Sequence, residues 1–392
     1  MIIGIDIRNI GKKRTGDEVV FFNLAKNLAR IDSKNEYKLF TDIGDADMLS
    51  KIKKDLEVGN KSNFEVISLT PSSSPRGRKG LLNNKFTWNL WTLPRYLRKN
   101  PVDIYHTQYI TPFFVPRKIK IITTIHDISF NFFPQFIKIA DLFFLKTLIP
   151  WSLKRTDQII AVSEFTKREI IKYYQIKPEK IERVYNAVAD NFTESAFSPA
   201  RLDEIRKKYD LPEKFIFYIG TMQPRKNLAL LVEAFGKVKE KIPDLKLVLA
   251  GGKNAYNFDK EIGKAIHRSS LSADVIFPGF VPEEEKAAFF RLAEIFCFPS
   301  HYEGFGIPIL EAFVAGIPVV ASDTPVHREI AGSAALFFDV SNSSDLAEKI
   351  YNLFTDKNLR QEFIEKGKIQ ARKFSWAKSA ERISDIYKKL SA

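Results

Sequence analysis

Two glutamates stand in the segment of this sequence whose residue types point most clearly to chemistry. Glu303 and Glu311 flank two glycines, Gly304 and Gly306, where a short apolar run passes into a helical pattern. Glycines let backbone amides approach a ligand closely, and the N-terminus of a helix favours negative charge. Carboxylates would repel a phosphate, so their natural partners are hydroxyl groups on the same ligand. The segment therefore predicts a ligand with both phosphate and sugar hydroxyls, although a helix N-terminus with an ordinary acidic first turn would also fit.

Two adjacent cations form a second candidate group. Arg225 and Lys226 end a loop that leads from an expected strand, Phe215–Ile219, to an expected helix, Leu228–Lys241. A fork-shaped guanidinium and a compact ammonium together suit the two phosphates of a diphosphate. Cations are disfavoured at the N-terminal end of a helix dipole, and this favours an anionic partner over a solvated basic pair.

A histidine is the weakest candidate. His126 follows the expected strand Ile119–Ile125 and precedes Asp127, which could orient the ring or merely cap a turn. A single histidine at a strand end is more often a structural hydrogen-bonding group than a catalyst. No histidines and cysteines have metal-ligand spacing, and no nucleophile-elbow sequence is present.

The elements that must position these residues alternate between short apolar runs and longer, one-sided helical patterns. Strands are expected at Ile2–Ile7, Tyr37–Phe40, Ile104–His106, Ile119–Ile125, Gln158–Val162, Phe215–Ile219, Lys246–Ala250, Val275–Phe277, Ile295–Phe298 and Pro318–Ala321. This alternation predicts an α/β protein with parallel sheets and helices on both faces. A new alternation of strands and helices begins at Phe215, after a polar stretch, and this indicates two sheets. Ligands of such sheets bind beyond the carboxyl ends of the strands, so we expect the motifs to line a cleft between the sheets.

Composition and charge limit the classes of protein. The chain has 392 residues, 45% of them hydrophobic, so we expect two or three domains with large cores rather than a disordered chain. The single cysteine, Cys297, rules out a disulfide within the chain. The net charge is +14, and residues 51–150 alone hold 16 basic and 6 acidic side chains. This concentration favours an anionic partner, which could be nucleic acid, acidic lipid or a phosphorylated substrate.

The two candidate groups resemble the motifs of a known family. Glu303 and Glu311 form an E-x7-E motif within EGFGIPILEA, and AGIPVVAS follows at 315–322. Together with Arg225 and Lys226, this segment is similar to the retaining glycosyltransferases of family 4, which have the GT-B fold. The resemblance extends along nearly the whole chain and includes the residues around His126 and the closing Phe374-Ser375-Trp376.

The resemblance implies two facing Rossmann-like domains, each built on a doubly wound parallel sheet. We expect an acceptor-side domain over residues 1–195 and a domain that binds the nucleotide-sugar donor over residues 196–374. Residues 375–392 would form a helix that crosses back to the first domain.

The resemblance also implies roles for individual residues. Arg225 and Lys226 would neutralise the donor diphosphate and then the departing nucleoside diphosphate. Glu303 would hold hydroxyls of the donor sugar, and His126 would complete the catalytic set beside the reacting carbon. Glu311 would bind the ribose of the donor. Further donor contacts are expected from Gly16, Phe280, Val281, Gly304, Phe305, Gly306 and Ile307. No metal cofactor is implied, because the cationic pair stands where a metal ion would otherwise lie.

One loop departs from the family pattern. The loop after the first strand usually offers closely spaced glycines near the diphosphate, whereas here Gly16 is followed by Asp17 and Glu18. An acid at that place would repel phosphate. Either the loop swings away or the basic residues at 12–14 take over its role.

The leading hypothesis is transfer of a hexosyl unit from a nucleotide diphosphate sugar to a glycan or lipid-linked acceptor, with retention of anomeric configuration, in the synthesis of a cell-surface polysaccharide or glycolipid. No secretion signal or membrane-spanning stretch is visible, so we expect a cytoplasmic protein, peripheral at most on the inner face of the membrane. The aromatic residues of the basic region, among them Trp88, Trp91 and Phe130 to Phe144, could rest on an anionic membrane or could equally be core.

Two other classes remain open. A nucleic-acid-binding protein would account for the charge and the aromatic residues, but no recognisable nucleic-acid-binding motif is present. A dinucleotide-dependent oxidoreductase would account for the α/β pattern, but its glycine fingerprint does not follow Ile2–Ile7. Both alternatives leave Glu303 and Glu311 unexplained.

Overall fold

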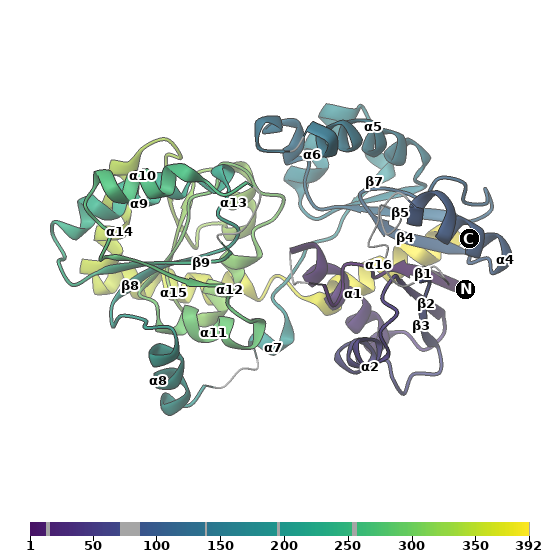
Figure 1. Ribbon diagram of the computed structural model, residues 1–392, viewed down its shortest axis with the longest axis horizontal. Helices are drawn as coiled ribbons and strands as arrows, with labels where there is room; N and C mark the ends of the chain where they lie inside the picture. The colour runs from purple at the N-terminus through teal and green to yellow at the C-terminus, as the bar shows by residue number, and fades with distance from the viewer. Residues whose placement is uncertain (13–15, 71–86, 138, 194–196, 253–256, 392) are drawn as a thin grey trace, which may run out of the picture. The chain divides into compact units, whose positions relative to one another are not determined.

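The chain forms two compact units, each described here by itself. The computed structural model describes residues 1–12, 16–70, 87–137, 139–193, 197–252 and 257–391 (Figure 1). The first unit contains Met1–Ile128, Phe143–Asn186 and the C-terminal segment from Trp376. The second unit contains Ser129–Leu142 and Ala187–Ser375.

A seven-stranded parallel sheet forms the centre of the first unit. Its strands lie in the order β3 (Phe64–Ser68), β2 (Glu36–Thr41), β1 (Ile2–Asp6), β4 (Ile104–Gln108), β5 (Lys120–Ile125), β6 (Gln158–Ala161) and β7 (Ile181–Arg183). The middle strands are apolar runs because helices cover both faces of the sheet. In β1, Ile3 and Ile5 are fully buried.

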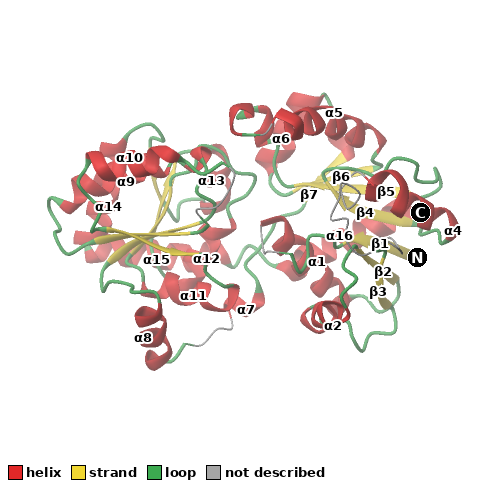
Figure 2. Ribbon diagram, viewed as in Figure 1, coloured by secondary structure: helices red, strands yellow, loops and turns green. Residues whose placement is uncertain are grey.

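Helices cover this first sheet, as Figure 2 shows. They are α1 (Gly16–Ile31), α2 (Ala46–Asp55), α4 (Leu93–Lys99), α5 (Ile139–Arg155), α6 (Glu164–Tyr174) and α16 (Trp376–Ser391), with a π-helical turn at Trp88–Thr92 and a 3-10 turn at Pro178–Lys180. Side-chain caps fix where helices begin. The Asp45 carboxylate accepts from the Met48 amide at the start of α2, and the Ser163 hydroxyl accepts from the Thr166 amide at the start of α6.

The C-terminal helix returns to the first unit and packs against α1. Its apolar stripe, Trp376, Ala380, Ile383 and Tyr387, recurs every three or four residues and is buried. The Ser379 hydroxyl also donates to the Tyr185 carbonyl at 2.6 Å. The predicted return of this helix is confirmed.

A six-stranded parallel sheet forms the centre of the second unit. Its order is β10 (Val275–Gly279), β9 (Lys246–Ala250), β8 (Phe215–Ile219), β11 (Ile295–Phe298), β12 (Val319–Ser322) and β13 (Leu336–Phe338). A cluster of aromatic rings fills one face. Phe217 contacts Phe290 edge-on at 5.1 Å and Phe296 at 6.0 Å between ring centroids, and all three are fully buried.

The helices of the second unit form two groups. They are α7 (Asp190–Thr193), α8 (Pro199–Lys208), α9 (Leu228–Lys239), α10 (Lys260–Arg268), α11 (Glu283–Leu292), α12 (Ile307–Ala315), α13 (Pro325–Ala331), α14 (Ser343–Thr355) and α15 (Lys357–Ala371), with 3-10 turns at Ser129–Asn131, Pro134–Phe136 and Pro224–Lys226. α9 packs against α10 and α14, whereas α12 packs against α11 and α15, on the opposite face of the sheet (Figure 1). The predicted pair of doubly wound parallel sheets is confirmed.

Three neighbouring strands of the second sheet end in glycines. Gly220 follows β8, Gly251 follows β9 and Gly279 ends β10, and all three have positive φ. The Gly251 amide donates to the Gly279 carbonyl at 2.8 Å. A β-carbon on Gly251 would lie 2.0 Å from the Gly220 carbonyl oxygen, so only glycine permits this close approach.

Candidate functional site

The two predicted groups of the second unit meet at the carboxyl ends of β8 and β11. Arg225 and Lys226 lie in the 3-10 turn that follows β8, and Glu303 lies in the loop that follows β11. β8 and β11 are adjacent and parallel, so the loops leaving them lie side by side. The His301 amide joins the loops by donating to the Arg225 carbonyl at 2.9 Å.

A buried ion cluster holds these side chains together. Arg225 Nη1 lies 3.2 Å from Glu303 Oε2 and 2.9 Å from the Tyr302 carbonyl, and Lys226 Nζ donates to Glu303 Oε1. The three side chains are at most 18% exposed. Two cations face one carboxylate, so this part of the cluster carries an excess positive charge for an anion.

The two cations keep Glu303 ionised. Burial by itself would raise the pKa of this carboxyl, but the charges of Lys226 and Arg225 and hydrogen bonds from Lys226 and Ser300 lower its pKa to about 2. Glu303 is therefore a carboxylate near neutral pH and a hydrogen-bond acceptor.

The start of α12 lies next to this cluster. Gly306 has φ of 106° and caps the helix, which begins with Ile307 and Pro308. Phe305 is buried and contacts Phe374 edge-on at 5.8 Å between ring centroids. The loop is thus anchored by an aromatic side chain, and it leads into the N-terminus of α12, which favours an anionic ligand.

Glu311 belongs to a second, separate charge cluster. It lies inside α12, and its Oε1 accepts from Lys286 Nζ of α11 at 2.6 Å. Burial raises the pKa of Glu311, and the ammonium of Lys286 opposes this shift. Sequence reasoning paired Glu303 with Glu311 but missed Lys286; its only signal is the spacing of three residues from Glu283, with which it forms an ion pair.

Two of the predicted donor contacts, Phe280 and Val281, lie in the loop that follows β10. Phe280 is 63% exposed, whereas Val281 is buried. The two neighbours therefore differ: the ring is available to stack on a flat ligand, and Val281 supports the loop from within.

Two predicted site residues, His126 and Gly16, lie in the first unit. His126 follows β5, is 8% exposed, and its Nε2 lies 2.9 Å from Gln108 Oε1. Gly16 is the first residue of α1. Glu18 is buried, and its carboxylate accepts from the Gly11 amide at 2.8 Å. Glu18, one of the two acids expected to repel phosphate at this loop, thus accepts a hydrogen bond from the protein's own backbone.

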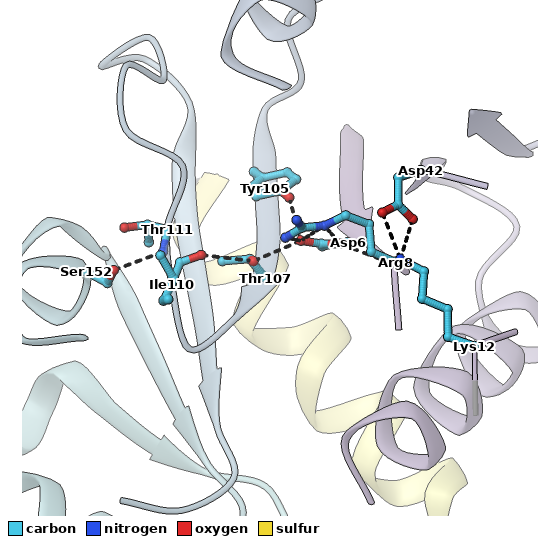
Figure 3. Close-up of polar contacts among 9 residues, drawn as sticks. All are labelled: Asp6, Arg8, Lys12, Asp42, Tyr105, Thr107, Ile110, Thr111 and Ser152. Carbon is cyan, nitrogen blue, oxygen red and sulfur yellow. Dashed lines mark hydrogen bonds and ion pairs between the residues drawn. The ribbon is translucent and has the colours of Figure 1, made fainter. Parts of the chain in front are cut away.

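Of the basic residues at 12–14, positions 13 and 14 fall outside the described residues. Lys12 forms an ion pair with Asp42 at 2.6 Å (Figure 3). Its charge is thus matched by a neighbouring carboxylate of the same unit.

A polar cluster at the ends of β1 and β4 was not predicted. Arg8 Nε and Nη2 donate to the buried Asp6 carboxylate at 2.9 and 2.6 Å, and the Tyr105 hydroxyl donates to Asp6 at 3.2 Å (Figure 3). The Arg8 guanidinium also lies over the Trp88 ring at 4.6 Å. Trp88 is therefore core, as is Phe130, whereas Trp91 is 70% exposed.

His327 is a further buried group that sequence reasoning missed. Its Nδ1 donates to the Ser322 carbonyl at 3.0 Å, and Nε2 has no hydrogen-bond partner among the described residues. Burial lowers its pKa to about 4. A β-carbon on Gly306 would lie 3.9 Å from its Cδ2, so this neutral imidazole supports the loop before α12.

The described residues contain neither a candidate metal site nor a candidate membrane span. No group of three or more His, Cys, Asp or Glu side chains there is arranged to hold a metal ion. In the same part of the chain, no helix has the length and apolar character needed to cross a bilayer.

Comparisons with known proteins cover both units. The family profile "Glycosyltransferase Family 4" matches residues 15–192, and "Glycosyl transferases group 1" matches residues 202–370. The O-antigen chain mannosyltransferase B of Escherichia coli is 26% identical over 371 residues, which are 94% of each chain.

Solved structures share the fold over the whole chain. A sucrose-phosphate synthase from Thermosynechococcus elongatus has a TM-score of 0.75 at 18% identity, covering 100% of this chain and 99% of that one. Anabaena HepE, solved in complex with UDP and glucose, has a TM-score of 0.72 at 17% identity, covering 99% and 100%. The two matched profiles, the order of the two sheets and the returning helix agree, and the chain belongs to the family 4 glycosyltransferases with the GT-B fold.

Proposed function

We propose that this glycosyltransferase moves a mannosyl unit from a nucleoside diphosphate mannose to a growing glycan or lipid-linked acceptor, with retention of anomeric configuration. The observation that carries the proposal is the buried cluster of Arg225, Lys226 and Glu303 at the strand ends. It offers two cations for a diphosphate and one ionised carboxylate for sugar hydroxyls.

The choice of mannose and of a polysaccharide acceptor has separate support. The E. coli relative named as an O-antigen chain mannosyltransferase aligns along 94% of both chains. Since both units are matched, the similarity includes the unit assigned to the acceptor as well as the unit assigned to the donor.

The ion cluster suggests how binding and departure of the diphosphate are coupled. Without ligand, the Glu303 carboxylate pairs with both cations and offsets one of their two charges. An arriving diphosphate draws Arg225 and Lys226 toward its oxygens and leaves the Glu303 carboxylate to accept from sugar hydroxyls. As the sugar–phosphate bond breaks, charge builds on the leaving diphosphate, and the same two cations stabilise it.

The bond changes in the proposed reaction balance without a covalent enzyme intermediate. The bond between the anomeric carbon and the diphosphate oxygen breaks, and a bond from the acceptor hydroxyl forms on the same face of the sugar. The proton of that hydroxyl passes to the leaving phosphate oxygen. Glu303, held between two cations, is too well neutralised to serve as the nucleophile.

A binding and transfer experiment tests this function. The protein is titrated with GDP-mannose, UDP-glucose, UDP-galactose and ADP-glucose by calorimetry, and transfer to an alkyl α-mannoside is followed by mass spectrometry. Binding and transfer of mannose support the proposal. Exclusive use of another sugar would refute the mannosyl assignment, and absence of any nucleotide binding would refute the donor site.

Variants of the ion cluster assign the activity to this site. Glu303→Ala and Lys226→Ala should each abolish transfer while the protein stays folded. Lys264 and Glu261 of α10 form an exposed ion pair at 2.7 Å in the same unit, so Lys264→Ala and Glu261→Ala are matched controls that keep full activity. Full activity in either cluster variant would contradict the assigned donor site.

The first unit is proposed to rest on an anionic membrane surface when it meets a lipid-linked acceptor. Three of its large apolar side chains are well exposed: Trp91 at 70%, Phe143 at 65% and Phe114 at 58%. Exposed aromatic rings beside basic residues favour the interface of acidic lipids. Vesicles with phosphatidylglycerol should sediment the protein, and Trp91→Ser with Phe143→Ser should weaken this; equal binding to neutral vesicles would contradict it.

A further inference from the structure

His327 is a fully buried histidine of α13 that packs against the ion cluster of Arg225, Lys226 and Glu303. Its ring lies 5.2 Å from the Phe298 ring of β11, and the Lys226 ammonium lies 5.6 Å from that same phenyl ring. The ring edge with Cδ2 faces Gly306, whose added β-carbon would lie 3.9 Å away. Through Phe298 and Gly306, the histidine therefore adjoins both the cations and the start of α12.

Hydrogen bonds at Ser322 fix which nitrogen of His327 carries the proton. The Ser322 hydroxyl donates to the Ser300 carbonyl at 2.5 Å, so it has no hydrogen left for the imidazole. His327 Nδ1 lies 3.0 Å from both the hydroxyl oxygen and the carbonyl oxygen of Ser322, and both can only accept there. Nδ1 therefore carries the hydrogen, and Nε2 of the neutral ring is an unprotonated lone pair.

The Nε2 lone pair of His327 is unpaired. This nitrogen is buried and has no hydrogen-bond partner among the described residues. A buried polar atom without a partner is uncommon and costs free energy. Since Nε2 is bonded to Cδ2, it lies on the side of the ring that faces Gly306. The structure thus places an unprotonated basic nitrogen next to the loop that leads into α12.

The charges of the ion cluster act on this imidazole. Burial has the largest effect and lowers the pKa of His327 to about 4, while the Glu303 carboxylate raises the pKa and the Lys226 ammonium lowers it. Arg328, on the same helix, forms an exposed ion pair with Asp323 at 2.6 Å. The ring is therefore neutral near pH 7 in the ligand-free protein, and a change in charge at the cluster changes its tendency to bind a proton.

A bound diphosphate would reverse the sign of the charge at the cluster. Arg225, Lys226 and Glu303 together have one excess positive charge. The diphosphate of a nucleotide sugar carries two negative charges, so the occupied cluster has one excess negative charge. A nearby negative charge favours the protonated form of a base. A neutral imidazole with an unprotonated nitrogen is suited to take up that proton.

We infer that His327 binds a proton at Nε2 when the nucleotide sugar binds, so that its imidazolium becomes a third cation of the donor site. The inference rests on the proposed function, since it presumes a diphosphate at Arg225 and Lys226. The proton comes from solvent on binding and returns to solvent when the diphosphate leaves, while Nδ1–H stays on Ser322. Donor affinity therefore increases as the pH falls from 8 to 5.5.

Counting protons by calorimetry tests this inference. GDP-mannose and UDP-glucose are titrated at pH 6 and pH 8 in buffers of different ionisation enthalpy, which gives the number of protons bound with each ligand. Nucleotide sugars are used because the terminal phosphate of free GDP or UDP itself titrates in this range. Wild type should take up about half a proton at pH 6 and almost none at pH 8. Its affinity should be about fourfold higher at pH 5.5 than at pH 8.

Histidine variants assign the proton to one ring. His327→Gln should bind without proton uptake, with equal affinity at pH 5.5 and pH 8, and within about twofold of wild type at pH 8. His301 lies in the loop after β11, and His267 is exposed near the end of α10. His301→Gln and His267→Gln are the matched controls and should keep the uptake of wild type.

Nuclear magnetic resonance provides a readout that does not depend on folding of His327→Gln. Wild type labelled with ¹⁵N-histidine is observed at pH 6 with and without GDP-mannose or UDP-glucose. One ring should change from the neutral form with Nδ1–H to the imidazolium when the protein is saturated. The same change should occur in His301→Gln.

The contrary outcomes are distinct. Binding of a nucleotide sugar without proton uptake overturns the inference while the proposed function stands. Uptake that persists in His327→Gln, or that is lost in His301→Gln, assigns the proton to another group and also overturns it. Absence of binding by every nucleotide sugar refutes the proposed function itself.

Discussion

Tyr387 of the C-terminal helix and His106 of β4 are joined by a hydrogen bond of 2.7 Å between the tyrosine hydroxyl and Nδ1, and both side chains are fully buried. The other ring nitrogen of His106, Nε2, lies 2.8 Å from the Thr124 hydroxyl of β5. One imidazole thus connects two central strands of the first sheet to the last helix of the chain.

The first prediction concerns the stability of this connection. Tyr387→Phe should lower the free energy of unfolding by about 1–3 kcal/mol, because it leaves a buried ring nitrogen without its partner. Urea denaturation followed by circular dichroism measures the change. Tyr173 of α6 is 46% exposed, and Tyr173→Phe should be neutral. Equal stability of Tyr387→Phe and wild type would show that the hydrogen bond contributes nothing.

The second prediction concerns pH. Burial lowers the pKa of His106 to about 3, aided by the charge of His126, and that of His327 to about 4, from an ordinary 6.5. Below pH 6.5 the unfolded chain takes up protons at these rings and the folded protein does not. Stability is therefore full above pH 6.5 and is lost as the pH falls toward 4, by up to about 1.4 kcal/mol per pH unit for each ring.

The substitution His327→Gln separates the contribution of this histidine to the pH dependence of stability from the contribution of the carboxylates. Burial raises the pKa of Glu311 and acts in the opposite direction, so the informative quantity is the difference between wild type and His327→Gln. That difference in the free energy of unfolding should change between pH 7.5 and 5, and the variant should show the flatter dependence. Parallel curves for the two proteins would contradict the assignment of the slope to His327.

The third prediction concerns Glu303 and the diphosphate. In the ligand-free protein this carboxylate occupies the cations that the diphosphate needs. Glu303→Gln should therefore abolish transfer yet bind the nucleoside diphosphate product about tenfold more tightly, because a competing negative charge has gone. Calorimetry with GDP and UDP measures the affinity. Weaker binding than wild type would contradict the exchange of partners at Arg225 and Lys226.

The fourth prediction contrasts neighbouring glycines at the end of β9. Gly251→Ala should cost at least about 2 kcal/mol, because its β-carbon would meet the Gly220 carbonyl oxygen and its φ of 141° disfavours alanine. Gly252→Ala has open space around the new methyl group and should be nearly neutral. Thermal unfolding of both variants tests the contrast, and a similar melting temperature for the two would refute it.

The strands in the middle of each sheet could be predicted, whereas of the edge strands only β10 was predicted. Phe215–Ile219 and Lys246–Ala250 match their predicted limits because strands covered on both faces are continuous apolar runs. The three unpredicted strands, β3, β7 and β13, each end a sheet and are partly exposed. β3 and β7 mix polar and apolar residues and resemble loops, whereas β13 is apolar but only three residues long.

The residues of the candidate site also include some that could be predicted from the sequence and some that could not. Arg225, Lys226 and Glu303 could be predicted because each follows a recognisable strand in a parallel sheet, where strand ends converge. Lys286 could not, because its partner Glu311 is on a different helix and only the packing of α11 on α12 brings them together. The same holds for His327, whose partners lie at the end of β12.

Because α16 belongs to the first unit, that unit cannot be completed during translation until the end of the chain has been synthesised. The strands of that unit are complete by Arg183, yet the helix that covers α1 leaves the ribosome only after the entire second unit. At about 5–20 residues per second, the delay for roughly 190 residues is about 10–40 s. During that time, the apolar face of α1 is not covered by α16, and His106 lacks its hydrogen bond to Tyr387. A nascent chain stalled in the second unit would therefore be a substrate for chaperones at its first unit.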